Sequence, residues 1–267
     1  MKHLVILESP KQKGGKLPSK LEMKGVSLSL RSKNALVIKD ISLSIERGKT
    51  AVLLGASGSG KSLSLSVLQG LIPENLKLAS GQVLLDGAPL DSTKARGRIF
   101  SSILQNPRTC FNPLFSLASH FRETLAALGM PYSRENIEAM LGEVGLSADA
   151  LSLYPFELSG GMLQRVMIAI ALLSGASFLI ADEPTSDLDF ANKQRLLDLL
   201  NALQTKRNLG LLIVTHDLDL AAKAANRIYL MHAGELRGTL CVDPLKRGEL
   251  KADLIQKLSS MEEEACY

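Results

Sequence analysis

Apolar residues occupy every second position in two stretches near the start of the chain. They are Val26, Leu28 and Leu30 in the first stretch, and Ile41, Leu43 and Ile45 in the second. Period-two alternation is typical of half-buried strands, so we predict an antiparallel, hairpin-like unit here. A second hairpin is predicted over residues 81–90, where Asp86 and Gly87 supply the sequence of a tight turn.

Farther along the chain, apolar residues come in short unbroken runs, as in strands buried on both faces of a parallel sheet. These runs occupy residues 50–54, 178–181, 210–215 and 227–231, with helical patterns near 190–204 and 218–225. The middle, from about 106 to 173, lacks such runs and has helical spacing at Ile137, Met140, Leu141 and Val144. We therefore predict an α/β fold whose sheet has an N-terminal antiparallel part and a helical insert at about 106–173.

The expected organisation is a flexible leader at 1–20, one domain at 21–240 and a short charged tail at 241–267, helical near 249–258. The uncharged run at 166–181 lies between Arg165 and Asp182 and is interrupted by Ser174 and Gly175. It is shorter than the stretch of about 18 apolar residues that suggests a membrane span. A buried helix followed by a buried strand explains it better.

Composition narrows the class of protein. The chain has 267 residues, 46% of them hydrophobic and 22% charged, which is ordinary for a globular domain. Cys110, Cys241 and Cys266 are scattered and form no CxxC pair, which favours a reducing compartment. Basic residues dominate before residue 40, and we interpret this as a solvated arm. With 4% aromatic residues the chain offers few surfaces for stacking bases, so no nucleic-acid partner is expected.

A phosphate-binding loop directly follows the apolar run at 50–54. Residues 55–62 match G-x-x-x-x-G-K-[ST] in full: Gly55, Ala56, Ser57, Gly58, Ser59, Gly60, Lys61 and Ser62. The glycines let backbone N–H groups face phosphate oxygens, and a helix that follows adds its positive end. We expect Lys61 to reach the β- and γ-phosphates and Ser62 to bind Mg²⁺. We therefore predict a P-loop nucleotide-binding sheet, with ATP or GTP and Mg²⁺ as its ligands.

Two carboxylates complete this prediction. Asp182 and Glu183 come directly after the apolar run at 178–181, at the carboxyl end where ligands of open α/β sheets bind. We expect Asp182, at the end of a strand neighbouring the phosphate-loop strand, to hold Mg²⁺. Glu183 is expected to orient or deprotonate the attacking water.

Two further polar residues follow apolar runs. His216 ends the run at 210–215, which we expect beside the Asp182 strand, and it is a candidate donor to the γ-phosphate. Gln105 follows Ile103 and Leu104 and is a candidate ligand of Mg²⁺ or of the water. Taken alone, either residue also fits a solvated surface position.

The segment 158–165, Leu-Ser-Gly-Gly-Met-Leu-Gln-Arg, opens a predicted helix with Ser159 as its N-cap. This string resembles the signature of ABC ATPases, and the motif order also resembles that family: phosphate loop, Gln105, signature, Asp182–Glu183, His216. Residues 186–189 resemble the family's D-loop. The resemblance implies a head-to-tail dimer, in which Ser159, Gly160 and Gly161 act in trans on the partner's nucleotide.

Residues 105–114 and 154–165 resemble the nickel and oligopeptide importer branch of this family, and more closely its nickel-import ATPases. That implies an ATP-hydrolysing importer subunit for nickel or a related metal complex, with oligopeptide import as the alternative. The implied partners are a paralogous or identical ATPase chain, two transmembrane permease subunits and an extracytoplasmic solute-binding protein. The implied location is peripheral, on the cytoplasmic side of the inner membrane. A soluble ABC protein acting on DNA or ribosomes usually has two ATPase units or a long coiled-coil insert, which this chain lacks.

The chain departs from the family where adenine would be stacked. Residues 21–45 contain no aromatic residue that would stack on adenine.

At the start of the predicted insert, Phe111 lies among Pro107, Arg108 and Pro113. We expect Phe111 to be an exposed anchor of the permease-docking surface; the alternative is that it packs into the insert's own core.

Overall fold

The computed structural model describes residues 17–186, 188–242 and 250–257. Its strands form one sheet in the order β5-β4-β1-β2-β10-β9-β3-β8-β7-β6. The first four strands in this order pair antiparallel, and their bounds are β1 (Lys20–Leu30), β2 (Leu36–Glu46), β4 (Leu76–Leu85) and β5 (Ala88–Pro89). The predicted antiparallel unit and second hairpin are confirmed. Asp86 and Gly87 turn between β4 and β5 with φ of 50° and 83°.

The other half of the sheet is parallel, apart from β10. Its strands are β3 (Thr50–Leu54), β6 (Phe100–Ile103), β7 (Phe178–Asp182), β8 (Gly210–Thr215), β9 (Arg227–His232) and β10 (Glu235–Cys241). β3 pairs in parallel with β8 and β9, β8 with β7, and β7 with β6. The predicted buried strands are all present. Their carboxyl ends therefore share one edge of the sheet, where the loops after β3, β7 and β8 meet.

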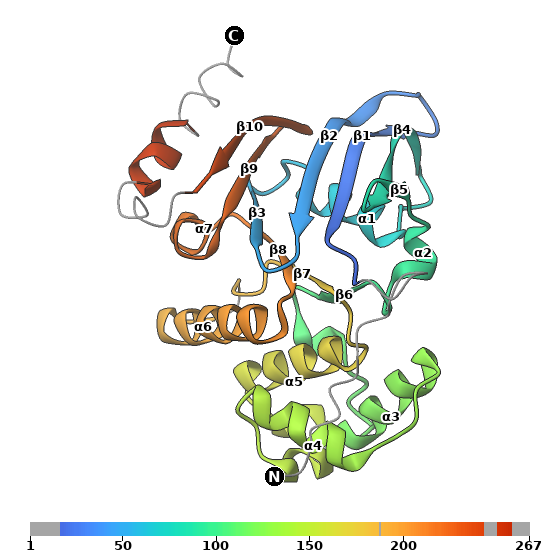
Figure 1. Ribbon diagram of the computed structural model, residues 1–267, viewed down its shortest axis with the longest axis vertical. Helices are drawn as coiled ribbons and strands as arrows, with labels where there is room; N and C mark the ends of the chain where they lie inside the picture. Colours follow the sequence, from blue (N-terminus) through green and yellow to red (C-terminus); the bar gives the residue numbers. More distant parts are fainter. Residues whose placement is uncertain (1–16, 187, 243–249, 258–267) are drawn as a thin grey trace.

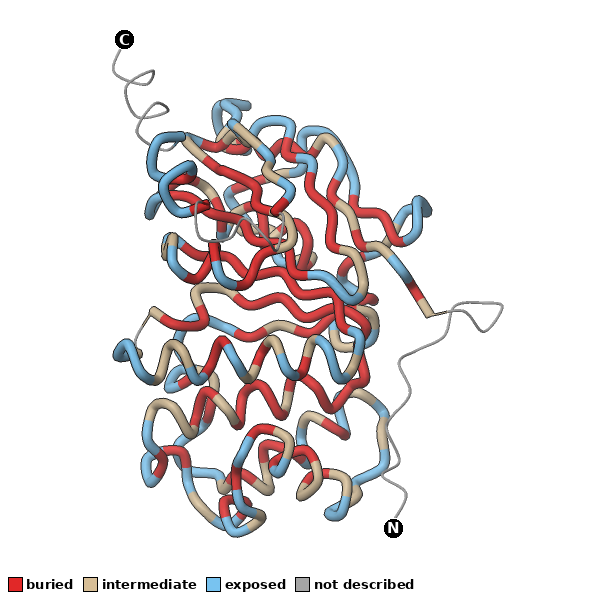
Figure 2. Tube along the Cα trace, turned by 60° about the vertical axis from the view of Figure 1, so that its left-hand side comes forward, coloured by how far each residue is buried: buried red, intermediate tan, exposed pale blue. Residues whose placement is uncertain are grey.

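The sheet separates two hydrophobic cores. Successive side chains of a strand point to opposite faces. Val52 and Leu54 thus join one core, with α5 (Gly160–Leu173), α6 (Phe190–Arg207) and α7 (Leu218–Ala224). Ala51 and Leu53 join the other, with α1 (Lys61–Gln69) and α2 (Ser92–Ala95). The strands form the buried centre of the molecule, with exposed residues on the outer helices (Figure 2).

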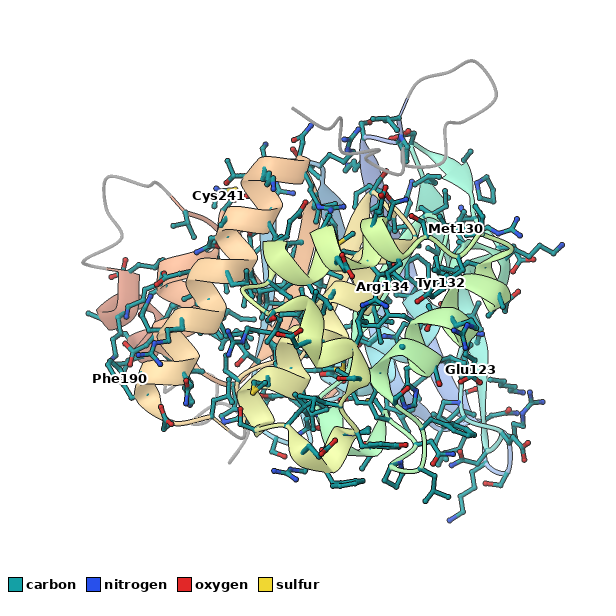
Figure 3. The ribbon with its side chains drawn as sticks, turned by 90° about the horizontal axis from the view of Figure 1, so that it is seen from below. Glu123, Met130, Tyr132, Arg134, Phe190 and Cys241 are labelled. Atoms are coloured by element: carbon teal, nitrogen blue, oxygen red, sulfur yellow. The ribbon has the colours of Figure 1, made fainter. Side chains whose placement is uncertain are left out.

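The helical insert lies between β6 and β7 and forms the end of the molecule below the sheet in Figure 1. Its helices are α3 (Leu117–Leu128), α4 (Arg134–Glu143) and α5, with 3₁₀ turns η1 (Pro107–Thr109), η2 (Ala148–Ser152) and η3 (Pro155–Glu157). Ile137, Met140, Leu141 and Val144, which have helical spacing, are all buried. The view from below places Glu123, Met130 and Tyr132 on one side and Phe190, at the start of α6, on the other (Figure 3).

The expectation for Phe111 was wrong. Its side chain is only 6% exposed and belongs to the core that the insert shares with the sheet. Its ring meets that of His120 edge to face, with centroids 5.2 Å apart. Leu114 and Phe115 are the exposed apolar residues of this loop, at 79% and 49%. Folding back onto α3 therefore takes Phe111 out of solvent and leaves its neighbours outside.

Several expectations fall partly outside the described residues. Residues 1–16 of the predicted leader and residues 243–249 and 258–267 of the tail lie outside them. Within the tail, residues 250–257 are helical, and Leu254 is fully buried. Among the described helices, none combines the length and the apolar character needed to cross a bilayer. The run at 166–181 forms most of α5 and β7, as predicted.

Candidate functional site

The loop after β3 depends on its glycines for its shape. Gly58 and Gly60 have φ of 80° and 105°, in the left-handed region that side chains disfavour. A Cβ on Gly55 would lie 2.3 Å from the carbonyl oxygen of Met231, so the loop packs against β9 at a distance that only glycine permits. The helix α1 starts at Lys61, directly after Gly60. The loop and the helix N-terminus together have the backbone geometry of a nest that suits phosphate oxygens.

The Lys61 ammonium is held inside this loop. Its Nζ atom donates to the carbonyl oxygens of Gly55 and Ala56, each at 2.8 Å, and lies 3.9 Å from Oε1 of Glu183. The side chain is 6% exposed. Burial lowers the pKa of Lys61, and the charges of Glu183 and Asp182 raise it in part. The loop therefore places a positive charge where phosphate oxygens would bind.

Asp182 ends β7 and faces the start of α1. Burial and the neighbouring Glu183 raise the pKa of its carboxyl, while Lys61 and a hydrogen bond with Ser62 lower it in part. Its Oδ1 atom is buried and has no hydrogen-bond partner among the described residues. A buried carboxylate oxygen without a partner, beside a hydroxyl, fits a hard divalent cation.

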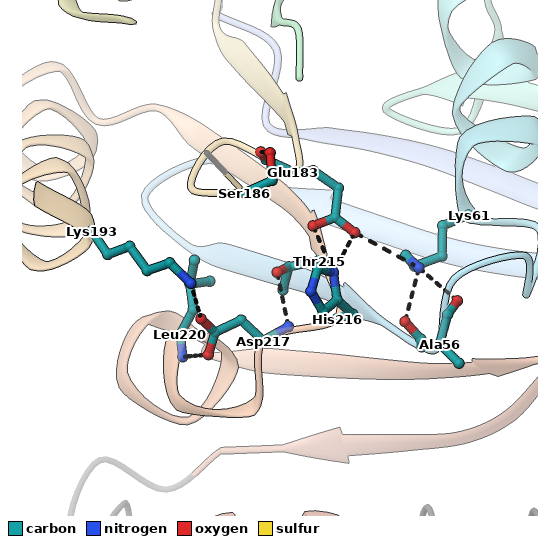
Figure 4. A network of polar contacts seen from close by, with 10 residues as sticks. Ala56, Lys61, Glu183, Ser186, Lys193, Thr215, His216, Asp217 and Leu220 are labelled. Atoms are coloured by element: carbon teal, nitrogen blue, oxygen red, sulfur yellow. Dashed lines mark hydrogen bonds and ion pairs between the residues drawn. The ribbon is translucent and has the colours of Figure 1, made fainter. Parts of the chain in front are cut away.

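Glu183 has an unusual backbone conformation. Its φ of 46° places a non-glycine residue in the left-handed region, a conformation that surrounding contacts have to enforce. Its N–H donates to Val214 of β8 at 2.8 Å, and its carbonyl oxygen accepts from the Ser186 hydroxyl at 3.1 Å. The turn aims the Glu183 carboxylate at His216 and Lys61 (Figure 4).

His216 meets both oxygens of that carboxylate. Its Nδ1 atom lies 2.9 Å from Oε2 and 3.0 Å from Oε1 of Glu183. Because an ionised carboxylate only accepts, Nδ1 carries the hydrogen of this contact. The Nε2 atom is thereby left for an outside partner, and the His216 side chain is 60% exposed.

The strand order corrects one expectation. β8 lies between β3 and β7, so the Asp182 strand is not a neighbour of the phosphate-loop strand. β8 does lie beside β7, as expected for His216, and Asp182 pairs with Val214. The intervening strand β8 ends next to His216, whose ring contacts the Glu183 carboxylate.

Polar residues on both sides of His216 hold the chain in place, and the motifs do not include them. The Thr215 hydroxyl accepts from the Asp217 N–H at 3.0 Å, and Asp217 caps α7 and pairs with Lys193 (Figure 4). The sequence signal for this role was Asp217 itself, because an Asp shortly after an apolar run is a common N-cap of the next helix. These contacts hold the backbone that leads from His216 into α7.

Gln105 follows β6 at the same edge of the sheet. Ile103 of β6 pairs with Ala181, the residue before Asp182, so the two chain segments leave the sheet side by side. The Gln105 side chain is exposed. The structure thus places Gln105 at the same edge of the sheet as Asp182, with an exposed side chain.

The segment 158–165 begins α5. The Ser159 hydroxyl accepts from the Met162 N–H at 3.3 Å and caps the helix. A Cβ on Gly160 or Gly161 would meet no atom within 4 Å, so packing within the chain does not require glycine there. α5 packs on the face of the sheet opposite α1, so Ser159 is not brought to the chain's own phosphate loop.

Comparison with known proteins agrees with these features. The ABC transporter family matches residues 38–186. The nickel import ATP-binding protein NikD of Pseudomonas putida is 45% identical over 223 residues, covering 82% of this chain and 86% of that protein. The NikD protein of Brucella abortus is 44% identical over 205 residues, covering 75% and 78%.

Solved structures are similar over most of the chain. The structure of an ATP-binding subunit of an ABC transporter superposes with a TM-score of 0.72 at 26% identity, covering 90% of this chain and 99% of that one. The dimeric cassette MJ0796, a bacterial ABC transporter cassette, gives 0.70 at 26% identity, covering 84% and 99%. The family match spans more than half of the chain and the relatives align over most of their own length, so this chain belongs to the ABC transporter family.

Proposed function

We propose that this chain is the ATP-hydrolysing subunit of an ABC importer that takes up nickel or a related metal complex. Relatives 42–45% identical over most of the chain are named nickel import ATP-binding proteins. The cluster of Lys61, Glu183 and His216 carries the catalytic part of the proposal, because the Glu183 carboxylate lies 3.9 Å from the Lys61 ammonium and 2.9 Å from the His216 imidazole. Oligopeptide import is the alternative in the same branch.

The nucleotide binds along residues 55–62. Backbone N–H groups of Ala56, Ser57, Gly58 and Gly60 face the phosphates, and Lys61 neutralises the β- and γ-phosphate charge. The N–H groups of Gly55 and Ser59 donate to the carbonyl oxygens of Thr215 and Ala56 and shape the loop. Asp182, Ser62 and Gln105 hold Mg²⁺. Bound Mg²⁺ supplies positive charge that offsets the charge developing on the phosphate oxygens. The buried Oδ1 of Asp182 supports this assignment.

Hydrolysis needs a water aimed at the γ-phosphorus. Glu183 accepts a proton from that water or orients it, since its carboxylate lies between Lys61 and His216 and its side chain is 13% exposed. His216 keeps the carboxylate in place through Nδ1 and presents Nε2 toward the γ-phosphate.

A second chain completes each site. Ser159, Gly160 and Gly161 are exposed or partly exposed at the start of α5, and open space surrounds both glycines. Free N–H groups and a hydroxyl at a helix N-terminus suit an anion. We infer that they bind the γ-phosphate held by the partner chain, whether that chain is identical or paralogous. The relative MJ0796 is dimeric.

The remaining partners are two permease subunits and an extracytoplasmic solute-binding protein, with this chain peripheral on the cytoplasmic face of the inner membrane. Leu114 and Phe115, exposed in the loop that leads into α3, are the apolar residues offered to a permease helix. Phe111 supports this loop from beneath.

The proposal is tested with the chain, its partner ATPase and the permeases reconstituted in liposomes with the solute-binding protein. ATP hydrolysis is expected to rise when nickel is supplied and to stay at its basal rate with short peptides. Stimulation by peptides and not by nickel would move the chain to the oligopeptide alternative. Failure of both, with the intact complex recovered on the membrane, would contradict an importer of this branch.

A further inference from the structure

The turn that carries Glu183 is held at several points. Left-handed backbone at a non-glycine residue persists only where surrounding contacts enforce it. The Glu183 N–H is bound to Val214, and the Glu183 carbonyl accepts from both the N–H and the hydroxyl of Ser186. The next carbonyl, that of Pro184, is bound by a side chain from a different element.

That side chain is Gln164 of α5. Its Nε2 atom donates to the Pro184 carbonyl oxygen at 2.9 Å, and Gln164 is 3% exposed. The carbonyl can only accept, which fixes the amide orientation. A buried hydrogen bond of this kind costs more to remove than an exposed one, because the carbonyl is left without a partner.

The same helix begins with Ser159, Gly160 and Gly161. Gln164 therefore connects two parts of the machinery: the helix that acts on the partner's nucleotide and the turn that aims Glu183 at the chain's own nucleotide. α5 extends from the cap at Ser159 through Gln164 without interruption. A displacement of its first turn is thus transmitted to the Pro184 carbonyl.

A cavity of about 530 Å³ lies between α4, α5 and α6, and Gly161, Gln164, Leu188 and Leu196 are among the residues that line it. Gln164 borders this cavity but is itself 3% exposed, and its hydrogen bond to Pro184 is buried. The bond is directional, so it fixes the position of the Pro184 carbonyl relative to α5.

We propose that Gln164 is a positioning residue for hydrolysis. It binds the Pro184 carbonyl and so fixes the left-handed turn that aims the Glu183 carboxylate at a constant position relative to α5. The inference rests on the role of Glu183 proposed above. Gln164 is buried and its amide is bonded to Pro184, so it acts on the catalytic step through the turn that carries Glu183. Loss of its amide donor is expected to lower kcat and to leave ATP binding unchanged.

The test compares two near-isosteric substitutions in the full-length chain. Gln164→Leu removes the bond to Pro184. Gln204→Leu is the matched control, because Gln204 also donates from its amide to a backbone carbonyl, that of Leu209, at the far end of α6. We expect Gln164→Leu to lower kcat by about tenfold, equivalent to one hydrogen bond's contribution, with KM for ATP within about twofold of wild type. Gln204→Leu is expected to keep the wild-type kcat. Equal kcat for the two variants would overturn the proposal.

A double variant separates positioning from general structural damage. If Gln164 acts through Glu183, Gln164→Leu is expected to slow single-turnover hydrolysis by less than about twofold further in a Glu183→Gln background, since groups that act as one unit are not additive. A full tenfold loss there would overturn the proposal. Should Gln164→Leu not fold, Gln164→Asn, which keeps the amide but is shorter by one methylene, takes its place. If Glu183→Gln alone hydrolyses at the wild-type rate, the proposed role of Glu183 is wrong, and this inference fails with it.

Discussion

His216 holds the Glu183 carboxylate from one side, with Nδ1 at 2.9 Å from Oε2, while Lys61 lies 3.9 Å from Oε1 on the other. The carboxylate is therefore placed between an imidazole that directly follows β8 and an ammonium at the start of α1. Neither donor is adjacent to Glu183 in sequence. This geometry limits where a bound water can be oriented, and it makes Glu183 and His216 act together.

His216→Ala is expected to lower kcat by roughly 10–100-fold with little change in ATP affinity, because it removes a donor to Glu183 and the Nε2 group facing the nucleotide. Steady-state ATPase assays with a separate binding titration measure the two quantities. His232, at the end of β9, is the control histidine, and His232→Ala is expected to keep the wild-type rate. An unchanged kcat in His216→Ala would remove His216 from the site.

Lys61→Ala is expected to weaken nucleotide binding by roughly 10–100-fold, the effect of losing one charge-assisted hydrogen-bond donor. Lys49 is the matched control: it is an exposed lysine paired with Glu46, one strand away from the phosphate loop. Titration of each variant with a fluorescent ATP analogue gives the dissociation constants. Equal affinity in Lys61→Ala and Lys49→Ala would show that the phosphate loop is assigned wrongly.

Asp182 is expected to lower the free energy of unfolding of the chain, because its carboxyl is buried in the site. Burial raises its pKa above the value in the unfolded chain. Protonation thus favours the folded state, and this contribution is lost as pH rises through the raised pKa. In the absence of Mg²⁺ and nucleotide, Asp182→Asn is therefore expected to raise Tm at pH 7.5 by about 2–4 °C, as about 1 kcal/mol does in a domain of similar size.

The difference in Tm is expected to shrink as the pH is lowered through the raised pKa, because wild-type Asp182 then also becomes neutral. Glu123→Gln, on the exposed side of α3 (Figure 3), is the control carboxylate and should leave Tm unchanged at both pH values. A lower Tm for Asp182→Asn at pH 7.5 would contradict this prediction.

Two residues of the loop around η1 are expected to differ in role, with Phe111 needed for stability and Leu114 for docking to the permeases. Phe111→Ala is expected to lower Tm strongly, since truncating a buried Phe costs about 3–5 kcal/mol. Leu114→Ser is expected to leave Tm and basal hydrolysis nearly unchanged while it reduces recovery of the chain with membranes that contain its permeases. Normal membrane recovery of folded Leu114→Ser would contradict the docking role of this loop.

The apolar runs made most of the sheet predictable, because strands buried on both faces consist almost entirely of apolar residues. Two strands, β6 and β10, were not predicted from the sequence, for physical reasons. β6 contains Ser101 and Ser102, and the Ser101 hydroxyl is satisfied in the core by Ser174 at 2.9 Å. β10 exposes much of its length and is held by pairing with β9 more than by burial.

The positions of Lys61, Asp182 and Glu183 at one edge of the sheet were predictable, because each belongs to a motif that directly follows an apolar run. It was not predictable where distant contacts decide. The insertion of β8 between β3 and β7 is a property of the whole sheet. The burial of Phe111 depends on His120 in α3, and the bond from Gln164 to Pro184 joins two segments whose proximity no local pattern encodes.

The central claim is that Glu183 drives hydrolysis at a site shared by two chains. Single-turnover hydrolysis by Glu183→Gln, with its partner chain present, tests it most directly. The account predicts wild-type ATP affinity, hydrolysis slower by roughly 10²–10⁴-fold, and an ATP-dependent dimer that persists on size-exclusion chromatography. Hydrolysis near the wild-type rate, with no accumulation of dimer, would contradict it.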